Sequence, residues 1–244
     1  MVRFRLPRAE GVEEFIDDPG VALEELSANL RDLERVNRLF GGTRLILHHL
    51  GSIVRRAHSG DIEILDVATG GADIPIAIVR WARRRGSRIR VVGIDQNPQV
   101  LRVATERIRE YPEIRLEHRD ALALPYPAGS FDVVLCSLAL HHFSFSEGIK
   151  LLASLDRIAR RGFIVNDLLR SRLAYILTWL AMRLFCRGRF VRHDGPLSIR
   201  RAYTRAELQK MLDDAGVGGV RMRRHPFFRV ALVKERVHAR PPNR

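Results

Sequence analysis

The chain has 244 residues, 46% of them hydrophobic, which suits one large domain, or one domain with an extension, around a full core. Its two cysteines, Cys136 and Cys186, are too far apart in sequence to indicate a disulfide framework or a metal-binding spacing. The net charge of +14 leaves open a functional anion site or a generic basic surface. A generic surface is favoured because only three of the 42 basic residues are lysine, and such a bias can reflect codon composition.

The sequence gives no sign of a targeting or membrane-spanning segment. The first residues, MVRFRLPRAEG, lack the apolar core of a signal peptide. The most apolar segment, residues 173–186, is about four residues short of a membrane span and contains Arg183. We therefore expect a cytoplasmic protein in which residues 173–186 form a buried helix or a helix with interfacial contact.

Two helices are expected before the first strand. Apolar residues recur at helical spacing through 21–40, the pair Gly41-Gly42 interrupts the pattern, and a second helix follows at 43–57. Residues 1–57 are thus predicted to be an N-terminal helical extension. It either roofs a ligand crevice or only packs on the core.

Short strands and helices alternate through residues 58–167. This alternation predicts βαβ units and a Rossmann-like α/β fold, with a doubly wound, mostly parallel sheet. The expected strands are 62–67, 90–95, 114–118, 131–135 and 162–166, and the expected helices are 74–85, 98–110 and 145–159.

Residues 168–203 depart from the alternation and are predicted to be a helical insertion or substrate lid. A long apolar helix is expected at 171–187, followed by a basic, turn-rich segment at 188–203. The apolar and aromatic side chains suit an apolar or aromatic ligand, whereas the arginines suit a carboxylate or phosphate. A plain packing helix with an arginine-rich loop is the alternative.

Residues 204–237 are expected to complete the core. Thr204 and Glu207 form the sequence pattern of a capping box at the start of a helix. Two strands are expected at 220–224 and 228–233, and their short join predicts an antiparallel edge pair.

The stretch IEILDVATGGAD, residues 62–73, organises the rest of the chain. A buried strand breaks into a turn of small residues, where backbone amides can approach a ligand, and Asp73 is expected to cap the following helix. Such turns at the carboxyl end of a parallel strand bind nucleotides. The dehydrogenase fingerprint G-x-G-x-x-G is absent, which disfavours a dinucleotide enzyme.

The series ILDVATGGAD, VVGIDQNP and HRDALALPYPAGSFDVVLCSLALHHF resembles the class I S-adenosylmethionine-dependent methyltransferases, most closely the ubiquinone/menaquinone-biosynthesis type. The resemblance covers residues 62–167. It implies S-adenosyl-L-methionine as cofactor and methyl transfer to a small, aromatic or lipophilic metabolite, on oxygen or carbon.

The first loop, by this resemblance, wraps the methionine part of the cofactor with Asp66, Ala68, Thr69 and Gly70. The family pattern is acid-x-Gly-x-Gly-x-Gly, and here alanine replaces the first and third glycines, at Ala68 and Ala72. Alanine disfavours a positive φ by about 1 kcal/mol or more. The departure leaves open a cofactor-binding scaffold protein that has lost catalysis.

Three further groups are predicted cofactor residues. Asp95 ends the second strand, where a carboxylate can accept both ribose hydroxyls, and Gln96 and Asn97 follow it. The resemblance implies that Asp120 meets the adenine amino group, that the Ala121 amide meets a ring nitrogen and that Leu122 packs on the ring. It also implies that Ser137 and Leu138 line the sulfonium region.

Catalytic candidates are histidines. His141 and His142 follow the fourth strand, and a neutral imidazole could take a proton from a phenol, although each could equally be structural. His193, next to Asp194, is a second candidate, but adjacent residues rarely pair well. No metal ligands are predicted.

A methyltransferase of nucleic acid or protein is the other alternative. Neither an N-P-P-Y-type tetrapeptide nor aromatic side chains interleaved with basic ones are present, so a small-molecule partner is favoured over nucleic acid.

Overall fold

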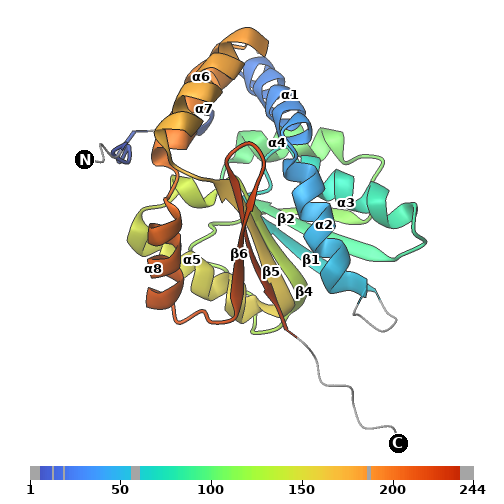
Figure 1. Cartoon of the computed structure of the whole chain (residues 1–244). Coiled ribbons are helices and arrows are strands. Elements are labelled where there is room, and N and C mark those ends of the chain that lie inside the picture. Colours follow the sequence, from blue (N-terminus) through green and yellow to red (C-terminus); the bar gives the residue numbers. More distant parts are fainter. Residues whose placement is uncertain (1–5, 13, 19, 56–60, 186–187, 237–244) are drawn as a thin grey trace, which may run out of the picture.

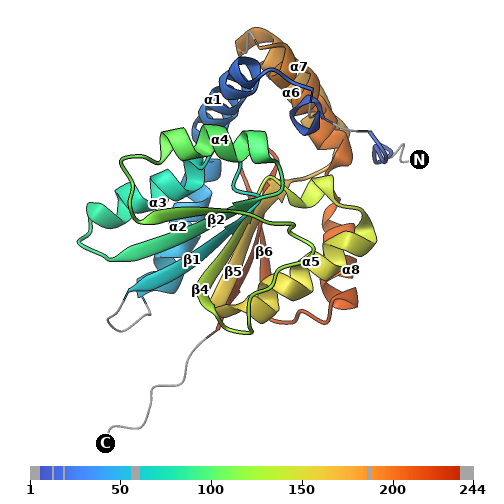
Figure 2. The same ribbon diagram turned by 180° about the vertical axis from the view of Figure 1, so that it is seen from behind.

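The computed structural model describes residues 6–236 except 13, 19, 56–60 and 186–187. Seven strands form one sheet with helices on both faces (Figures 1 and 2). The strands are β1 (Ile62–Val67), β2 (Ile89–Asp95), β3 (Ile114–His118), β4 (Phe131–Ser137), β5 (Ala159–Leu168), β6 (Val220–His225) and β7 (Arg229–Glu235). The helices are α1 (Leu23–Leu39), α2 (Gly42–Arg55), α3 (Asp73–Arg83), α4 (Pro98–Arg107), α5 (Phe145–Ile158), α6 (Arg172–Phe185), α7 (Arg189–Arg201) and α8 (Arg205–Asp214), with short 3-10 helices η1 (Phe15–Asp17) and η2 (Leu140–His142).

The sheet has the strand order β3-β2-β1-β4-β5-β7-β6. The first five strands are parallel, and β7 runs antiparallel to both β5 and β6. The prediction of a Rossmann-like, mostly parallel sheet with an antiparallel edge pair is therefore confirmed. The order reverses between β1 and β4, so the carboxyl ends of these strands flank the crevice where open α/β sheets bind ligands.

Two apolar layers hold the helices on the sheet. Side chains of β1 alternate between them: Leu65 packs with α5 and α8, whereas Ile64 packs with α2 and α3. Both residues are fully buried. Burial on both faces is the reason that β1 is an almost continuous apolar run.

The segment 188–203 was expected to be a basic, turn-rich loop, and this prediction was wrong. Its residues form the helix α7, with Pro196 inside it. Phe190, Val191 and Ile199 are buried, and their burial stabilises a helix that the local Gly-Pro signal disfavours. Tertiary packing outweighs local propensity here.

The prediction that Asp73 caps the helix after β1 was also wrong. Ala72 is the N-cap residue, in the left-handed region at φ 59°, so Asp73 already occupies the first helical position. Its carboxylate instead accepts a hydrogen bond from Asn37 Nδ2 of α1 at 3.0 Å. By contrast, the capping box of Thr204 and Glu207 at the start of α8 is present as predicted.

Across the described ranges, none of the helices combines the length and apolar character that a bilayer-spanning helix requires.

Candidate active site

A large cavity lies at the carboxyl edge of the parallel strands. Its volume is about 1580 Å³, and its walls come from the strand ends, α1, α6, α7 and the segment before η1. The predicted residues that line it are Asp66, Ala68, Thr69, Gly70, Asp95, Gln96, Asn97, Asp120, Ala121, Leu122, Ser137, Leu138, His141 and His142. The loops after β1, β2, β3 and β4 are thus brought together because parallel strands end at one edge.

The loop after β1 is tightly wound around a buried acid. Ala68 and Ala72 have φ of 56° and 59°, and Gly70 has φ of 55°. The two alanines, at positions where the family pattern has glycine, therefore hold the left-handed conformation at a cost of about 1 kcal/mol or more each. Asp66 is 2% exposed, and its Oδ2 accepts a hydrogen bond from Thr69 Oγ1 at 2.7 Å.

The carboxylate of Asp66 is held in an unfavourable environment. Burial raises its pKa to about 7, against the lowering effect of the Thr69 hydroxyl, and nearby Asp73 and Asp95 raise it further. A cation bound beside Asp66 would favour the ionised carboxylate and lower its pKa. The site therefore fits a ligand with a positively charged group, such as the amino group of S-adenosylmethionine.

Asp95 ends β2 and supports the neighbouring loop. It accepts hydrogen bonds from the backbone amides of Gly70 and Asn97, both at 3.0 Å. An ionised carboxylate can accept about four hydrogen bonds and is thus a suitable acceptor for a diol. Asn97 uses its side-chain oxygen to cap α4, through the amides of Gln99 and Val100. It is therefore engaged by the protein itself.

The ends of β4 and β5 are joined at the cavity. Ser137 Oγ accepts a hydrogen bond from Asn166 Nδ2 at 2.8 Å, and the Leu138 amide donates to the Asn166 carbonyl at 2.7 Å. Leu138 has φ of 56°, a strained value for leucine. Such strain is found where surrounding contacts hold a functional loop in one shape.

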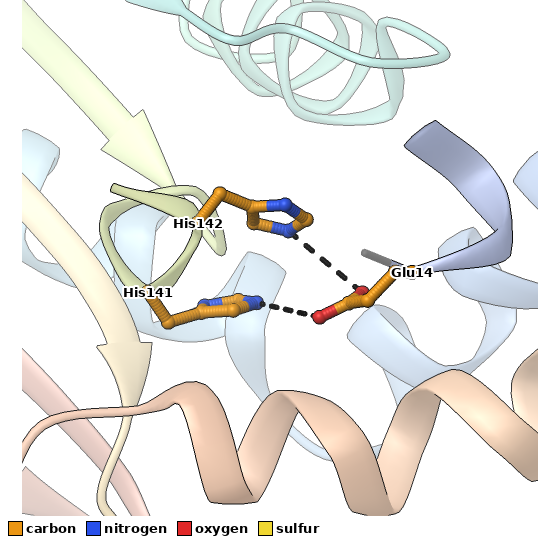
Figure 3. A group of neighbouring side chains, drawn as sticks. All are labelled: Glu14, His141 and His142. Atoms are coloured by element: carbon orange, nitrogen blue, oxygen red, sulfur yellow. Dashed lines mark ion pairs between the residues drawn. The ribbon is translucent and has the colours of Figure 1, made fainter. Parts of the chain in front are cut away.

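His141 lies in a buried network of acids and bases. Its Nδ1 lies 2.6 Å from Asp167 Oδ1, and its backbone amide donates to Asp167 Oδ2 at 3.0 Å. Its Nε2 lies 3.6 Å from Glu14 Oε1, and His142 Nε2 lies 3.8 Å from Glu14 Oε2 (Figure 3). Burial alone would lower the pKa of His141, but Asp167 and Glu14 together raise it to about 10. His141 is therefore protonated at neutral pH.

Glu14 is the residue that the sequence analysis missed. It is 5% exposed and accepts a hydrogen bond from Ser198 Oγ of α7 at 2.9 Å, and Arg201 Nη1 lies 3.8 Å from it. Burial would raise the pKa of Glu14, but the neighbouring histidines and Arg201 lower it. No local pattern marks Glu14, because its partners lie more than a hundred residues away.

Glu14, His141 and His142 are residue types that bind metals, and their ligand atoms lie within 4.8 Å of one another. No metal-ligating group was predicted from the sequence. The two acids, Glu14 and Asp167, lie beside two basic side chains, His141 and Arg201. Chemically, the group is an ion-pair network at the cavity wall.

His193 does not join this group. It is absent from the cavity lining, and its ring packs 4.3 Å from that of Phe15. Its Nδ1 lies 2.9 Å from Asp194 Oδ1, so the expectation that these neighbours would pair poorly was wrong. Asp194 is held in place because it also accepts a hydrogen bond from the Phe15 amide at 3.0 Å.

Comparison with known proteins agrees with this geometry. A family model described as a methyltransferase domain matches residues 64–162. The demethylmenaquinone methyltransferase of Deinococcus radiodurans is 32% identical over 149 residues, which are 59% of this chain and 58% of the relative. The chain thus spans little more than half the length of that relative.

Solved structures share the fold. A SAM-dependent methyltransferase from Aquifex aeolicus has a TM-score of 0.56 at 16% identity, covering 85% of this chain and 96% of its own. Human N-acetylserotonin methyltransferase in complex with SAM has a TM-score of 0.61 at 14% identity, covering 88% and 56%. The methyltransferase domain matched at residues 64–162 makes the chain similar to the class I S-adenosylmethionine-dependent methyltransferases, with S-adenosylmethionine as cofactor. Within that class it is similar to the quinone-biosynthesis type.

The raised pKa of His141 predicts a pH-dependent stability. A histidine has a pKa of about 6.5 in the unfolded chain, and in the folded protein the carboxylates of Asp167 and Glu14 raise the pKa of His141 to about 10 against the lowering effect of burial. The contribution to folding is therefore complete below about pH 6.5 and is lost as the pH rises towards about 10. We expect the difference in unfolding free energy between the intact protein and an Asp167→Asn variant to shrink over this range in urea denaturation.

Asp214→Asn is the matched control, because Asp214 forms an exposed ion pair with Lys210 at 2.7 Å. The effect of Asp214→Asn on the unfolding free energy should be small throughout this pH range. A difference for Asp167→Asn that stays constant from pH 6.5 to 10 would contradict the ion-pair assignment.

Proposed function

We propose that the protein transfers the methyl group of S-adenosylmethionine to a small aromatic or lipophilic acceptor, on oxygen or carbon. The observation that carries the proposal is the two-sided cavity. Acids at the strand ends line one part, and apolar side chains from the insertion, including Leu177, Ala181 and Met182, line another. One cavity can therefore hold a polar cofactor and an apolar acceptor together.

The acceptor class has support from the relatives. Demethylmenaquinone methyltransferases are among the similar proteins, and their name describes a quinone-type substrate. In this proposal residues 168–203 are the substrate lid, since α6 and α7 form the apolar wall. A lid that excludes water keeps the donor and the acceptor in attack geometry.

The roles of the cofactor residues follow from their positions. The methionine part would lie in the loop from Asp66 to Gly70, with its amino group beside Asp66. Asp95 would accept the ribose hydroxyls, and Asp120 would face the adenine. Bound S-adenosylmethionine would supply the electrophilic methyl group.

His142 is the proposed general base. His141 is protonated at neutral pH because of its acid partners, so it is unable to accept a proton there. His142 lines the cavity with 24% of its side chain exposed, next to the Glu14 carboxylate. That carboxylate would stabilise the charge which His142 gains on taking a proton from the acceptor hydroxyl. His141 would position Glu14.

Asp95→Ala should weaken binding of S-adenosylmethionine by about 10- to 100-fold, because charged hydrogen bonds to the ribose are lost. Isothermal calorimetry measures this directly. Glu106→Ala, at an exposed position on α4, is the control and should bind like the intact protein. If the intact protein fails to bind the cofactor, the catalytic proposal fails and the scaffold alternative replaces it. Unchanged affinity in Asp95→Ala would refute the ribose role alone.

Cofactor affinity should also depend on the ionisation of Asp66. Its pKa is raised to about 7, and the ionised form binds the amino cation better. Affinity should therefore rise about fivefold between pH 6 and pH 7. Calorimetry at both pH values should show the rise in the intact protein but not in Asp66→Asn. If Asp66→Asn shows the same rise, the pH dependence of cofactor affinity belongs to another ionisable group.

His142→Ala should lower kcat by about 100-fold or more when the acceptor is a phenol, since general bases contribute about 10²–10⁴-fold. Cofactor affinity should stay unchanged. His48→Ala is the matched control, because His48 is an exposed histidine on α2 outside the cavity. Steady-state turnover with lipophilic phenols measures the effect. Unchanged turnover in His142→Ala would remove it as the base.

A further inference from the structure

Helix α6 exposes a continuous apolar stripe. Leu173, Ile176, Leu180 and Leu184 are 59%, 57%, 44% and 67% exposed. They stand at helical spacing, so they share one face. Of ten large apolar side chains that are exposed among the described residues, six belong to this one helix. Scattered apolar side chains are ordinary on a protein surface, whereas a contiguous patch indicates a contact surface.

The opposite face of α6 already has its packing partners. Ala174 and Met182 are buried, and Thr178 and Ala181 line the cavity. α6 also packs against α7. Figures 1 and 2 show both helices with α1 at one end of the molecule, beyond the carboxyl edge of the sheet. The fold therefore leaves the apolar stripe free to meet something else.

The charged side chains of α6 itself are all positive. The sequence of α6 contains no Asp or Glu, and its Arg172 and Arg183 are exposed. Arg183 lies over the ring of Trp179, 4.2 Å from its centroid, and Trp179 is 40% exposed. The only acid of α7, Asp194, is buried. Apolar side chains flanked by arginine and tryptophan are typical of helices that lie in a membrane interface.

We propose that α6 docks flat on an anionic lipid bilayer, with its apolar stripe in the interface and its arginines at the headgroups. The helix has 14 residues, too few to span a bilayer, so an in-plane orientation fits its length. A chain with a net charge of +14 is attracted to anionic lipid.

Docking there would join the membrane to the proposed acceptor site. Leu177 is 44% exposed and also lines the cavity, so one residue belongs to both the outer surface of α6 and the inner wall. A lipophilic acceptor could then pass from lipid into the cavity without crossing water. The passage of an acceptor into the cavity rests on the proposed function, whereas the docking of α6 on the membrane does not.

Sedimentation with vesicles tests the docking. The intact protein should bind phosphatidylglycerol vesicles at least tenfold more strongly than phosphatidylcholine vesicles, and salt should weaken the binding. The triple variant Ile176→Gln, Leu180→Gln, Leu184→Gln should lose at least tenfold in partitioning. These three residues do not line the cavity, and the substitutions leave the net charge unchanged.

Leu39→Gln is the control, because Leu39 is 71% exposed on α1, away from α6. It should bind vesicles like the intact protein. Circular dichroism and calorimetric cofactor binding without lipid should be the same for all variants. Failure of cofactor binding would refute the proposed function and leave the vesicle result intact.

Two results would overturn the proposal. One is an intact protein that binds anionic vesicles no better than neutral ones, or a triple variant that binds as well as the intact protein. The other is a dimer in light scattering that the triple variant converts to a monomer, because the stripe would then be covered by a second copy of the chain.

Discussion

A buried chain of ion pairs, from Asp167 through His141 to Glu14, joins three distant parts of the sequence. Asp167 belongs to β5, His141 to η2 after β4, and Glu14 to the segment that precedes η1. Removing one partner of a buried pair leaves an uncompensated charge and costs about 3–5 kcal/mol. Ser198 and Arg201 of α7 also contact Glu14, so the N-terminal segment and the insertion are held at the same point. The walls of the cavity depend on this network.

The loops after β1 and β4 depend on backbone strain. Ala68, Ala72 and Leu138 hold positive φ values at the ends of β1 and β4. Each conformation is kept by surrounding contacts, such as the hydrogen bond from Gly70 to Asp95 and that from Leu138 to Asn166. Glycine would remove this strain. β1 and β4 are each paired with a strand on either side, which lets the loops keep a shape that alanine and leucine disfavour.

The insertion gives the cavity its apolar character and its proposed route of access. α6 has two apolar faces, one packed on α7 and the cavity and one exposed. The exposed face adds nothing to the packing of the protein, and the contact of its apolar surface with water is unfavourable in free energy. The same helix therefore links the acceptor site with the proposed membrane surface, through Leu177.

The sequence by itself determined the sheet, the turn after β1 and the set of cofactor loops. Their signals are local: apolar runs, small residues and acids at strand ends, which parallel strands bring to one edge as a rule. Only the tertiary structure decided the role of Glu14, the helical state of α7 and the exclusion of His193 from the cavity. Glu14 is paired with residues more than a hundred positions away, and α7 is helical because its apolar side chains are buried. Contacts between residues so far apart leave no periodic pattern in the sequence, because they depend on where folding brings each segment.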